Sequence, residues 1–169
     1  WRDKIDEVVR AHLPDATAED KLAIDRIGAF LVLLAQGVPF MHLGQDFYRT
    51  KRGNGNSYNA GDDVNKIRWE WKRESRALFD FYRGLAAIRN AHPAFRLPLR
   101  AAVEKRIHFG IIREPYFVCE IDAGRLDDQW RWIVAIVNPL PEEMHYEAPA
   151  APAGWDVHVH DGKASVEPL

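Results

Sequence analysis

The chain has 169 residues, of which 47% are apolar and 28% charged, and its formal net charge is -2 at pH 7. This is enough apolar sequence to bury a core, as one large domain or two small ones. The nearly balanced charge gives no electrostatic footprint for nucleic acid or an anionic membrane, so neutral polymers remain possible partners. No apolar run approaches the roughly 20 residues that span a bilayer.

The first predicted element is a helix over residues 17–36. Thr17 and Asp20 have the spacing of a capping box, and apolar residues recur at helical intervals from Ile24 to Leu34. Because residues 29–35 are apolar all round, we expect this helix to be covered on most sides, in part by something outside the chain.

A strand is predicted over residues 38–43, followed by a polar loop over 44–66. A short apolar run that leaves through Gly, Asn and Asp residues is typical of a parallel strand whose outgoing loop faces a ligand. Amides and carboxylates in this loop can pair with sugar hydroxyls, and the ring of Tyr58 can cover the apolar face of a pyranose. Turn formation is the alternative interpretation of the same residues.

The second half begins with a predicted helix over residues 74–92, which carries an apolar stripe and ends at Pro93. After it the hydrophobic period changes to two, which predicts strands over 107–113, 116–122, 130–138, 144–148 and 155–160. His160-Asp161 reads as part of a hairpin turn, with Asp161-Gly162 joining the last of these strands to residues 163–167. The expected result is a small antiparallel β-sandwich.

For three further residue types we prefer a structural interpretation over a reactive or ligand-binding one. Cys119 excludes an internal disulfide and lies in an apolar run, which predicts a buried, inert thiol. Trp130 and Trp132 share one face of a strand, and we expect them in the core or at a domain contact. His158 and His160 could hold a metal, but no third ligand is visible, so no metal is predicted.

Several stretches together resemble the last barrel strand and following loop of type I pullulanases, the starch-debranching enzymes of the α-amylase superfamily (glycoside hydrolase family 13). They are Gly44-Gln45-Asp46-Phe47, Asn56-Ser57-Tyr58-Asn59 and Asn65-Lys66-Ile67-Arg68-Trp69. The resemblance is strong from Ala23 to Leu97, and Trp1-Arg2-Asp3-Lys4-Ile5 looks like the family stretch that follows the last catalytic His-Asp. Asp46 stands where the family has Glu, and Arg68 where it has Asp.

This resemblance implies an α+β fold in two parts. Residues 1–93 would be a helix-strand-helix fragment from the C-terminal end of a (β/α)8 catalytic barrel. Residues 94–169 would be an all-β antiparallel sandwich domain. A complete barrel takes about 250 residues, so most of its strands are expected elsewhere in a longer protein.

The implied parent is a retaining glycoside hydrolase that cleaves α-1,6 branch linkages in pullulan, starch or glycogen. Its catalytic carboxylates are expected on earlier strands, and their motifs are missing here, so we predict no catalytic residue and no activity for this chain alone. Asp46, Asp62 and Asp63 lie near the predicted mouth, but neighbours on one loop rarely aim at opposite sides of one bond. The resemblance carries glucan contacts on the glycone side over to Arg49, Tyr58, Asn59 and Asp63.

The expected partners are an α-glucan, through the parent enzyme, and the remainder of the barrel. Self-association of the isolated chain is also expected, and no cofactor, nucleic acid or membrane. Two other functions stay open: an independent carbohydrate-binding module with exposed, coplanar aromatics on the sandwich, and an accessory domain that serves only as support or as a protein-interaction surface. The sequence leaves the compartment open between secreted and cytoplasmic.

Overall fold

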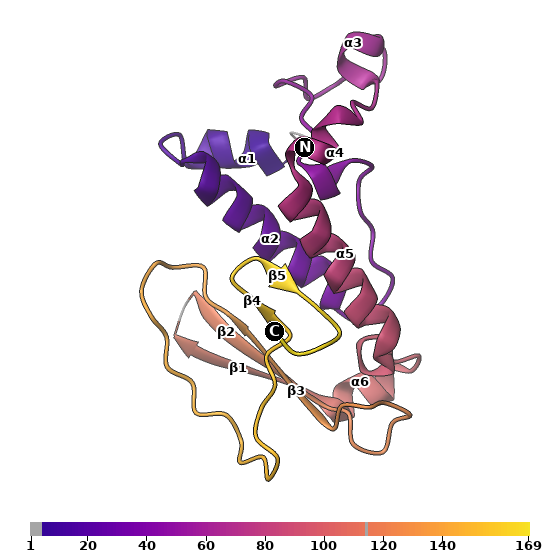
Figure 1. Ribbon diagram of the computed structural model, residues 1–169, viewed down its shortest axis with the longest axis vertical. Coiled ribbons are helices and arrows are strands. Elements are labelled where there is room, and N and C mark those ends of the chain that lie inside the picture. The colour runs from indigo at the N-terminus through magenta and orange to yellow at the C-terminus, as the bar shows by residue number, and fades with distance from the viewer. Residues whose placement is uncertain (1–4, 114) are drawn as a thin grey trace.

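The computed structural model describes residues 5–113 and 115–169, so the Trp1–Lys4 part of the pullulanase resemblance lies outside the described residues. Figure 1 shows the main helices at one end of the molecule, a sheet at the other, and a small hairpin between them. In chain order the elements are α1 (Ile5–His12), α2 (Ala18–Leu34), η1 (Gln45–Phe47), α3 (Asp62–Asn65), α4 (Glu70–Glu74), α5 (Arg76–Ala91), η2 (Pro93–Phe95), α6 (Arg100–Arg106), β1 (Ile107–Arg113), β2 (Tyr116–Asp122), β3 (Trp132–Val137), β4 (Val159–His160) and β5 (Lys163–Ala164).

Helix α2 begins at the capping box that the sequence predicts. The Thr17 hydroxyl accepts a hydrogen bond from the Asp20 backbone N–H at 3.1 Å, and the Asp20 carboxylate accepts one from the Thr17 N–H at 2.8 Å. One face of α2 packs against α5, with Ala29 and Leu33 in a shared buried cluster. Leu31 and Val32 are exposed, so part of the apolar surface of α2 is uncovered.

The apolar stripe of α5 is buried as its helical spacing predicts. The buried members are Leu78, Phe81, Tyr82, Leu85 and Ile88. The helix is shorter than the predicted range because Ser75 leaves the helical conformation and separates α5 from the single turn of α4. Pro93 then begins η2, since proline cannot continue the hydrogen-bond ladder of the preceding helix.

The strand predicted over residues 38–43 is not formed. These residues run from Gly37, at φ 87°, to the turn at Leu43 without pairing to any strand in the described part of the chain. Val38 is 96% exposed and Phe40 is 86% exposed. A parallel strand is held by neighbours that bond its backbone and cover its faces, and neither is supplied by residues 5–113 or 115–169.

The sheet half is simpler than a sandwich. Strands β1, β2 and β3 form one antiparallel sheet in that order, with Phe109 opposite Cys119 and Cys119 opposite Ala135. Strands β1 and β2 have the predicted bounds, but no strand forms over 144–148, where prolines on both sides remove backbone donors. A second full sheet is therefore absent from the described residues, and the sandwich is not confirmed. Helix α6 was not predicted.

A two-stranded hairpin, β4–β5, joins the two halves. Asp161 and Gly162 both have positive φ, at 44° and 70°, as a type I′ turn requires, so the interpretation of His160-Asp161 as part of a turn is confirmed. Val159 and Ala164 pack against both buried clusters of the molecule, one between α2 and α5 and one between α5, η2 and the sheet. The second cluster contains residues from both sides of position 93/94, so the domain boundary expected there stays a prediction.

In the described part of the chain, the helices are too short or too polar to cross a membrane.

Candidate functional site

The polar loop over residues 44–66 is held together by its own side chains. The Lys51 ammonium donates to the Ser57 hydroxyl and, at 2.7 Å, to the Asn65 side-chain oxygen. The Asn65 amide donates to the Ser57 carbonyl at 2.6 Å, and the Asn54 side chain accepts from the Asn56 N–H at 3.1 Å. These hydrogen bonds hold the loop together, which agrees with the interpretation that its polar residues form turns.

Arg49 lies at the root of this loop and is buried, with 7% of its surface exposed. Its guanidinium donates to the Leu43 carbonyl at 3.3 Å and to the Asn65 carbonyl, so it joins the segment before η1 to helix α3. One guanidinium donor, Nε, is buried without a partner among the described residues. In this structure Arg49 therefore holds the two ends of the loop together.

The other three candidate contacts are on the outside of the loop. Tyr58 is 83% exposed, and Asn59 and Asp63 are exposed as well. The backbone carbonyl of Asp63 accepts from the Arg68 guanidinium at 3.1 Å, so the residue that departs from the family pattern also steadies this loop. Of the four candidate contacts, Arg49 is thus buried and holds the loop, and the other three side chains are exposed.

The carboxylates near the loop differ in their surroundings. Asp62 and Asp63 follow one another in the first turn of α3 and are exposed. Asp46 is half-buried on η1, and burial raises the pKa of its carboxyl.

A buried polar cluster, which the sequence analysis missed, lies beneath the loop root. Asp25 on α2 is fully buried and accepts a hydrogen bond from the Tyr82 hydroxyl on α5 at 2.6 Å. Burial raises the pKa of Asp25 to about 6, although the hydrogen bond from Tyr82 lowers it. Burial likewise raises the pKa of Tyr48, to about 12. The available signal was an acidic residue, next to Arg26, between apolar residues of the predicted helix.

A second buried pair lies at the junction with the sheet. His92 Nδ1 and Asp128 Oδ1 are 2.7 Å apart, and the Asp128 carboxylate also accepts from the backbone N–H groups of Ala94 and Trp130. Burial acts to raise the pKa of Asp128, but these hydrogen bonds outweigh it and the pKa is lowered. The His92 ring stacks on Trp130 with centroids 3.5 Å apart, and Trp130 packs against the buried cluster of α5, η2 and the sheet.

Cys119 and His158 have the following surroundings. Cys119 is half-buried, and burial raises the pKa of its thiol to about 11, so the thiol is unreactive at neutral pH. His158 packs against Trp130, and its Nδ1 lies 3.2 Å from the Ser165 carbonyl oxygen. Among the described residues, no three His, Cys, Asp or Glu side chains gather as a metal site would require.

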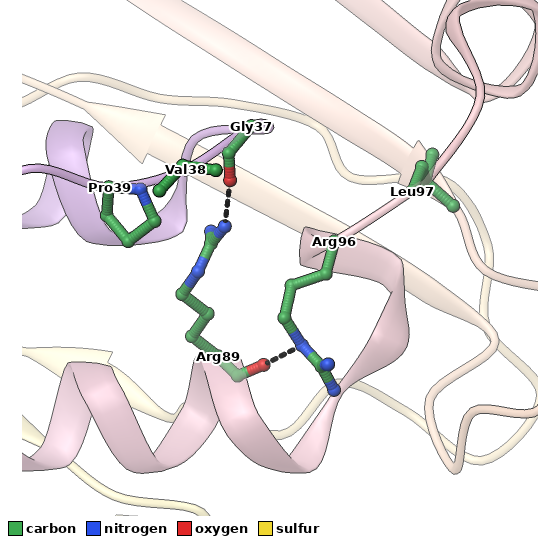
Figure 2. Close-up of a pocket in the computed structure, with 6 residues that line it drawn as sticks. All are labelled: Gly37, Val38, Pro39, Arg89, Arg96 and Leu97. Atoms are coloured by element: carbon green, nitrogen blue, oxygen red, sulfur yellow. Dashed lines mark hydrogen bonds between the residues drawn. The ribbon is translucent and has the colours of Figure 1, made fainter.

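A hollow of about 380 Å³ lies where the predicted strand would begin, lined by Gly37, Val38, Pro39, Arg89, Arg96 and Leu97 (Figure 2). Arg89 donates to the carbonyls of Leu33 and Ala35 at 3.0 and 2.6 Å and also to that of Gly37. Arg96 donates to the carbonyls of Arg89 and Asn90, both at 3.0 Å. Figure 2 shows the two guanidinium groups pointing to opposite sides, so they cap helix ends and do not converge on a common ligand.

Comparison with known proteins identifies the family of this chain. No family model matches the chain. The pullulanase of Bacillus subtilis (strain 168) is 34% identical over 140 residues, which cover 81% of this chain. The solved pullulanase of Bacillus acidopullulyticus superimposes on 99% of this chain with a TM-score of 0.91 and 29% identity. The chain is a pullulanase-like segment of the α-amylase superfamily.

A second solved structure agrees. The type I pullulanase of Bacillus subtilis, crystallised with maltose, matches 96% of this pullulanase-like segment with a TM-score of 0.86 and 28% identity. The segment spans only about a fifth of each of these proteins, with coverages of 19%, 21% and 23%. The segment therefore shares the fold of one part of these much longer pullulanases.

Proposed function

We propose that this chain is the C-terminal part of a retaining glycoside hydrolase that cleaves α-1,6 linkages in pullulan, starch or glycogen. In this proposal the chain has no catalytic residue and no activity of its own. It completes the catalytic barrel and supplies glucan contacts through the loop over residues 44–66. The similarity to pullulanases over nearly the whole chain, one of them solved with maltose, supports the proposal.

The observation that carries the proposal is the unpaired apolar segment over residues 38–43. Val38, Phe40 and Leu43 are exposed in succession, beside a helix whose Leu31 and Val32 are also exposed. Burying one such side chain is worth about 1.5–3 kcal/mol, so a chain that leaves several in water is stabilised by a partner surface. Neighbouring barrel strands would cover this segment and bond its backbone. The same exposed residues favour self-association of the isolated chain.

The proposed glucan contacts are Tyr58, Asn59 and Asp63, with Arg49 as a fourth. The exposed Tyr58 ring offers a flat apolar face, and Asn59 and Asp63 offer groups that donate to or accept from sugar hydroxyls. Arg49 is buried and donates to the Leu43 and Asn65 carbonyls, so its proposed role is to hold α3 in place beneath the exposed contacts.

A titration with maltotriose, monitored by the NMR chemical shifts of the backbone amides, tests the glucan contacts. We expect the shifts of Tyr58, Asn59 and Asp63 to move with sugar concentration, and Tyr58→Ala to weaken binding about tenfold through loss of the stacking surface. Trp155→Ala, which removes an exposed indole in the C-terminal part of the chain, is the matched control and should leave binding unchanged.

Shifts confined to the sheet half and abolished by Trp155→Ala would instead favour an independent carbohydrate-binding module. No shift anywhere, at millimolar maltotriose, would contradict the proposed contacts and favour a supporting domain.

A further inference from the structure

The outer part of the candidate glucan loop is one short stretch between two hydrogen-bonded residues. The Asn65 amide donates to the Ser57 carbonyl at 2.6 Å, so residues 57–65 form a closed loop. The three exposed candidate contacts lie on it, namely Tyr58, Asn59 and Asp63. Figure 1 shows α3, which ends this stretch, projecting beyond the other helices at one end of the molecule. The exposed contacts are therefore placed by the hydrogen bonds of the stretch and not by packing in the core.

Two local turns fix how the contacts leave the 57–65 stretch. The Ala60 N–H donates to the Ser57 carbonyl at 3.1 Å and closes a β-turn. The central residues of this turn are Tyr58 and Asn59. The Asn65 N–H donates at 3.0 Å to the carbonyl of the residue that precedes α3, and so closes the helical turn that carries the third contact. A displacement of Ser57 thus moves the first turn, and a displacement of Asn65 moves α3.

Lys51 joins the two ends of this stretch. Its ammonium donates to the Ser57 hydroxyl and, at 2.7 Å, to the Asn65 side-chain oxygen. Together with the bond from Asn65 to Ser57, these bonds make a closed triangle in which each residue contacts the other two. Hydrogen bonds from an ammonium are charge-assisted and therefore stronger than neutral ones. Ser57 is buried and the other two residues are half-buried, so water competes for these bonds less than it does at an exposed site.

The backbone that carries Lys51 is itself fixed to the helical part of the chain. The Lys51 carbonyl accepts from the Asn54 N–H at 3.1 Å, which closes a turn. This turn lies against α1, since a Cβ at Gly53 would be 3.5 Å from a carboxylate oxygen of Glu7. On the other side of Lys51, Arg49 is buried at the loop root. The Lys51 side chain therefore connects the fixed side of the loop with its projecting side.

We propose that Lys51 is a positioning residue for the exposed glucan contacts, and that its two hydrogen bonds hold the 57–65 stretch in its binding conformation before a sugar arrives. The inference rests on the proposed function of this loop as a glucan contact. A loop that is ordered before binding loses less conformational entropy when the sugar binds, and its affinity is higher for that reason. Removal of the ammonium therefore lowers the affinity although every contact side chain is still present.

Lys51→Met in the full chain tests this, because methionine keeps much of the side-chain length and removes the donors. The first readout is the NMR order parameters of the backbone amides of residues 58–63. We expect values of about 0.85 in the unsubstituted chain and below about 0.6, as in flexible backbone, in the variant. Lys51→Arg should restore the higher values, because a guanidinium can donate to both acceptors. The urea midpoint should be the same for all three proteins, since these bonds lie outside both buried clusters.

Maltotriose affinity is the second readout. We expect Lys51→Met to weaken it about tenfold and Lys51→Arg to retain most of it. Lys105→Met is the control for the loss of a charge, because it removes an exposed cation from α6 and should leave the order parameters and the affinity as in the unsubstituted chain. Ser57→Ala removes one acceptor of the ammonium, so it should lower the same order parameters, and it serves as the second variant if Lys51→Met folds poorly.

The two readouts separate a failure of this inference from a failure of the proposed function. Absence of maltotriose binding in the unsubstituted chain would refute the proposed function, while the order parameters still decide whether Lys51 holds the loop. Order parameters of residues 58–63 in Lys51→Met equal to those of the unsubstituted chain would overturn the inference. A loss of order in Lys51→Met without a loss of affinity, or an equal loss of order in Lys105→Met, would overturn it as well.

Discussion

Gly84→Ala is expected to destabilise the chain by roughly 2 to 3 kcal/mol, although alanine is the better helix former. Gly84 lies inside α5, against the C-terminal hairpin. A Cβ there would lie 2.0 Å from the Ala164 carbonyl oxygen and 2.6 Å from its carbonyl carbon. Since both atoms are backbone, no side-chain rotation relieves the overlap, and β4–β5 must move off the helix. Urea unfolding measures the loss, and hydrogen exchange should localise it to residues 159–164.

The same substitution at Gly28 is the matched control. Gly28 lies in α2, where a Cβ would meet only the Ile5 side chain, at an ordinary 3.6 Å. Gly28→Ala should therefore stabilise the chain by up to about 1 kcal/mol through helix propensity alone. If both variants were stabilised equally, the hairpin would not be seated on α5 as described.

Arg89→Met is expected to cost roughly 2 to 3 kcal/mol and to release the segment after α2. Arg89 is buried on α5 and donates to three carbonyls at and just after the end of α2, those of Leu33, Ala35 and Gly37. Methionine keeps much of the side-chain volume but leaves the Leu33 carbonyl buried without a donor and removes a cation from the helix C-terminus. Urea unfolding gives the free energy, and the amide shifts of residues 36–39 report the release.

Arg96→Met tests whether the location of the guanidinium matters. Arg96 lines the same hollow but is exposed, and it donates only to the carbonyls of Arg89 and Asn90. Water can replace these bonds, so the loss should stay within about 1 kcal/mol. Equal losses for the two variants would mean that Arg89 does not hold the end of α2.

Elements that are fixed by local chemistry were predictable from the sequence. The Thr17–Asp20 capping box begins α2, and the Asp161-Gly162 pair forms the type I′ turn of the last hairpin. In both cases the deciding interactions lie within a few residues of one another. The bounds of β1 and β2 were predictable for a related reason, since each pairs with a strand that the chain itself contains.

Elements that depend on distant partners were not predictable. Residues 38–43 have the composition of a buried parallel strand, but a strand exists only when others pair with it, and none does so in the described residues. Residues 144–148 alternate as a strand does, but they form none, and prolines on both sides remove backbone donors. Helix α6 was not predictable because Leu99, the residue before it, is not a capping residue and its seven residues carry no apolar stripe.

The sequence selects a candidate loop but does not predict which of its polar residues are used inside it. Family resemblance selects the loop, but composition does not tell which polar residues hold it and which face solvent. Ser57 and Asn65 are used internally, whereas Tyr58 and Asn59 are exposed. Arg49 is buried between the segment that ends at Leu43 and the end of α3, and sequence spacing does not reveal this contact. Asp25 was missed because an acidic residue next to Arg26 gives no periodic signal that distinguishes a buried side chain from an exposed one.

The most direct test of the account is hydrolysis of pullulan by a graft, in which this chain replaces the matching stretch of the Bacillus subtilis pullulanase. We predict reducing-sugar release from the graft, none from the isolated chain, and loss of activity in a graft carrying Phe40→Asp, because the charge would enter the barrel wall. Leu99→Asp, at an exposed leucine outside the 38–43 segment, should leave activity intact. Hydrolysis by the isolated chain, or a folded graft without any, would contradict the account.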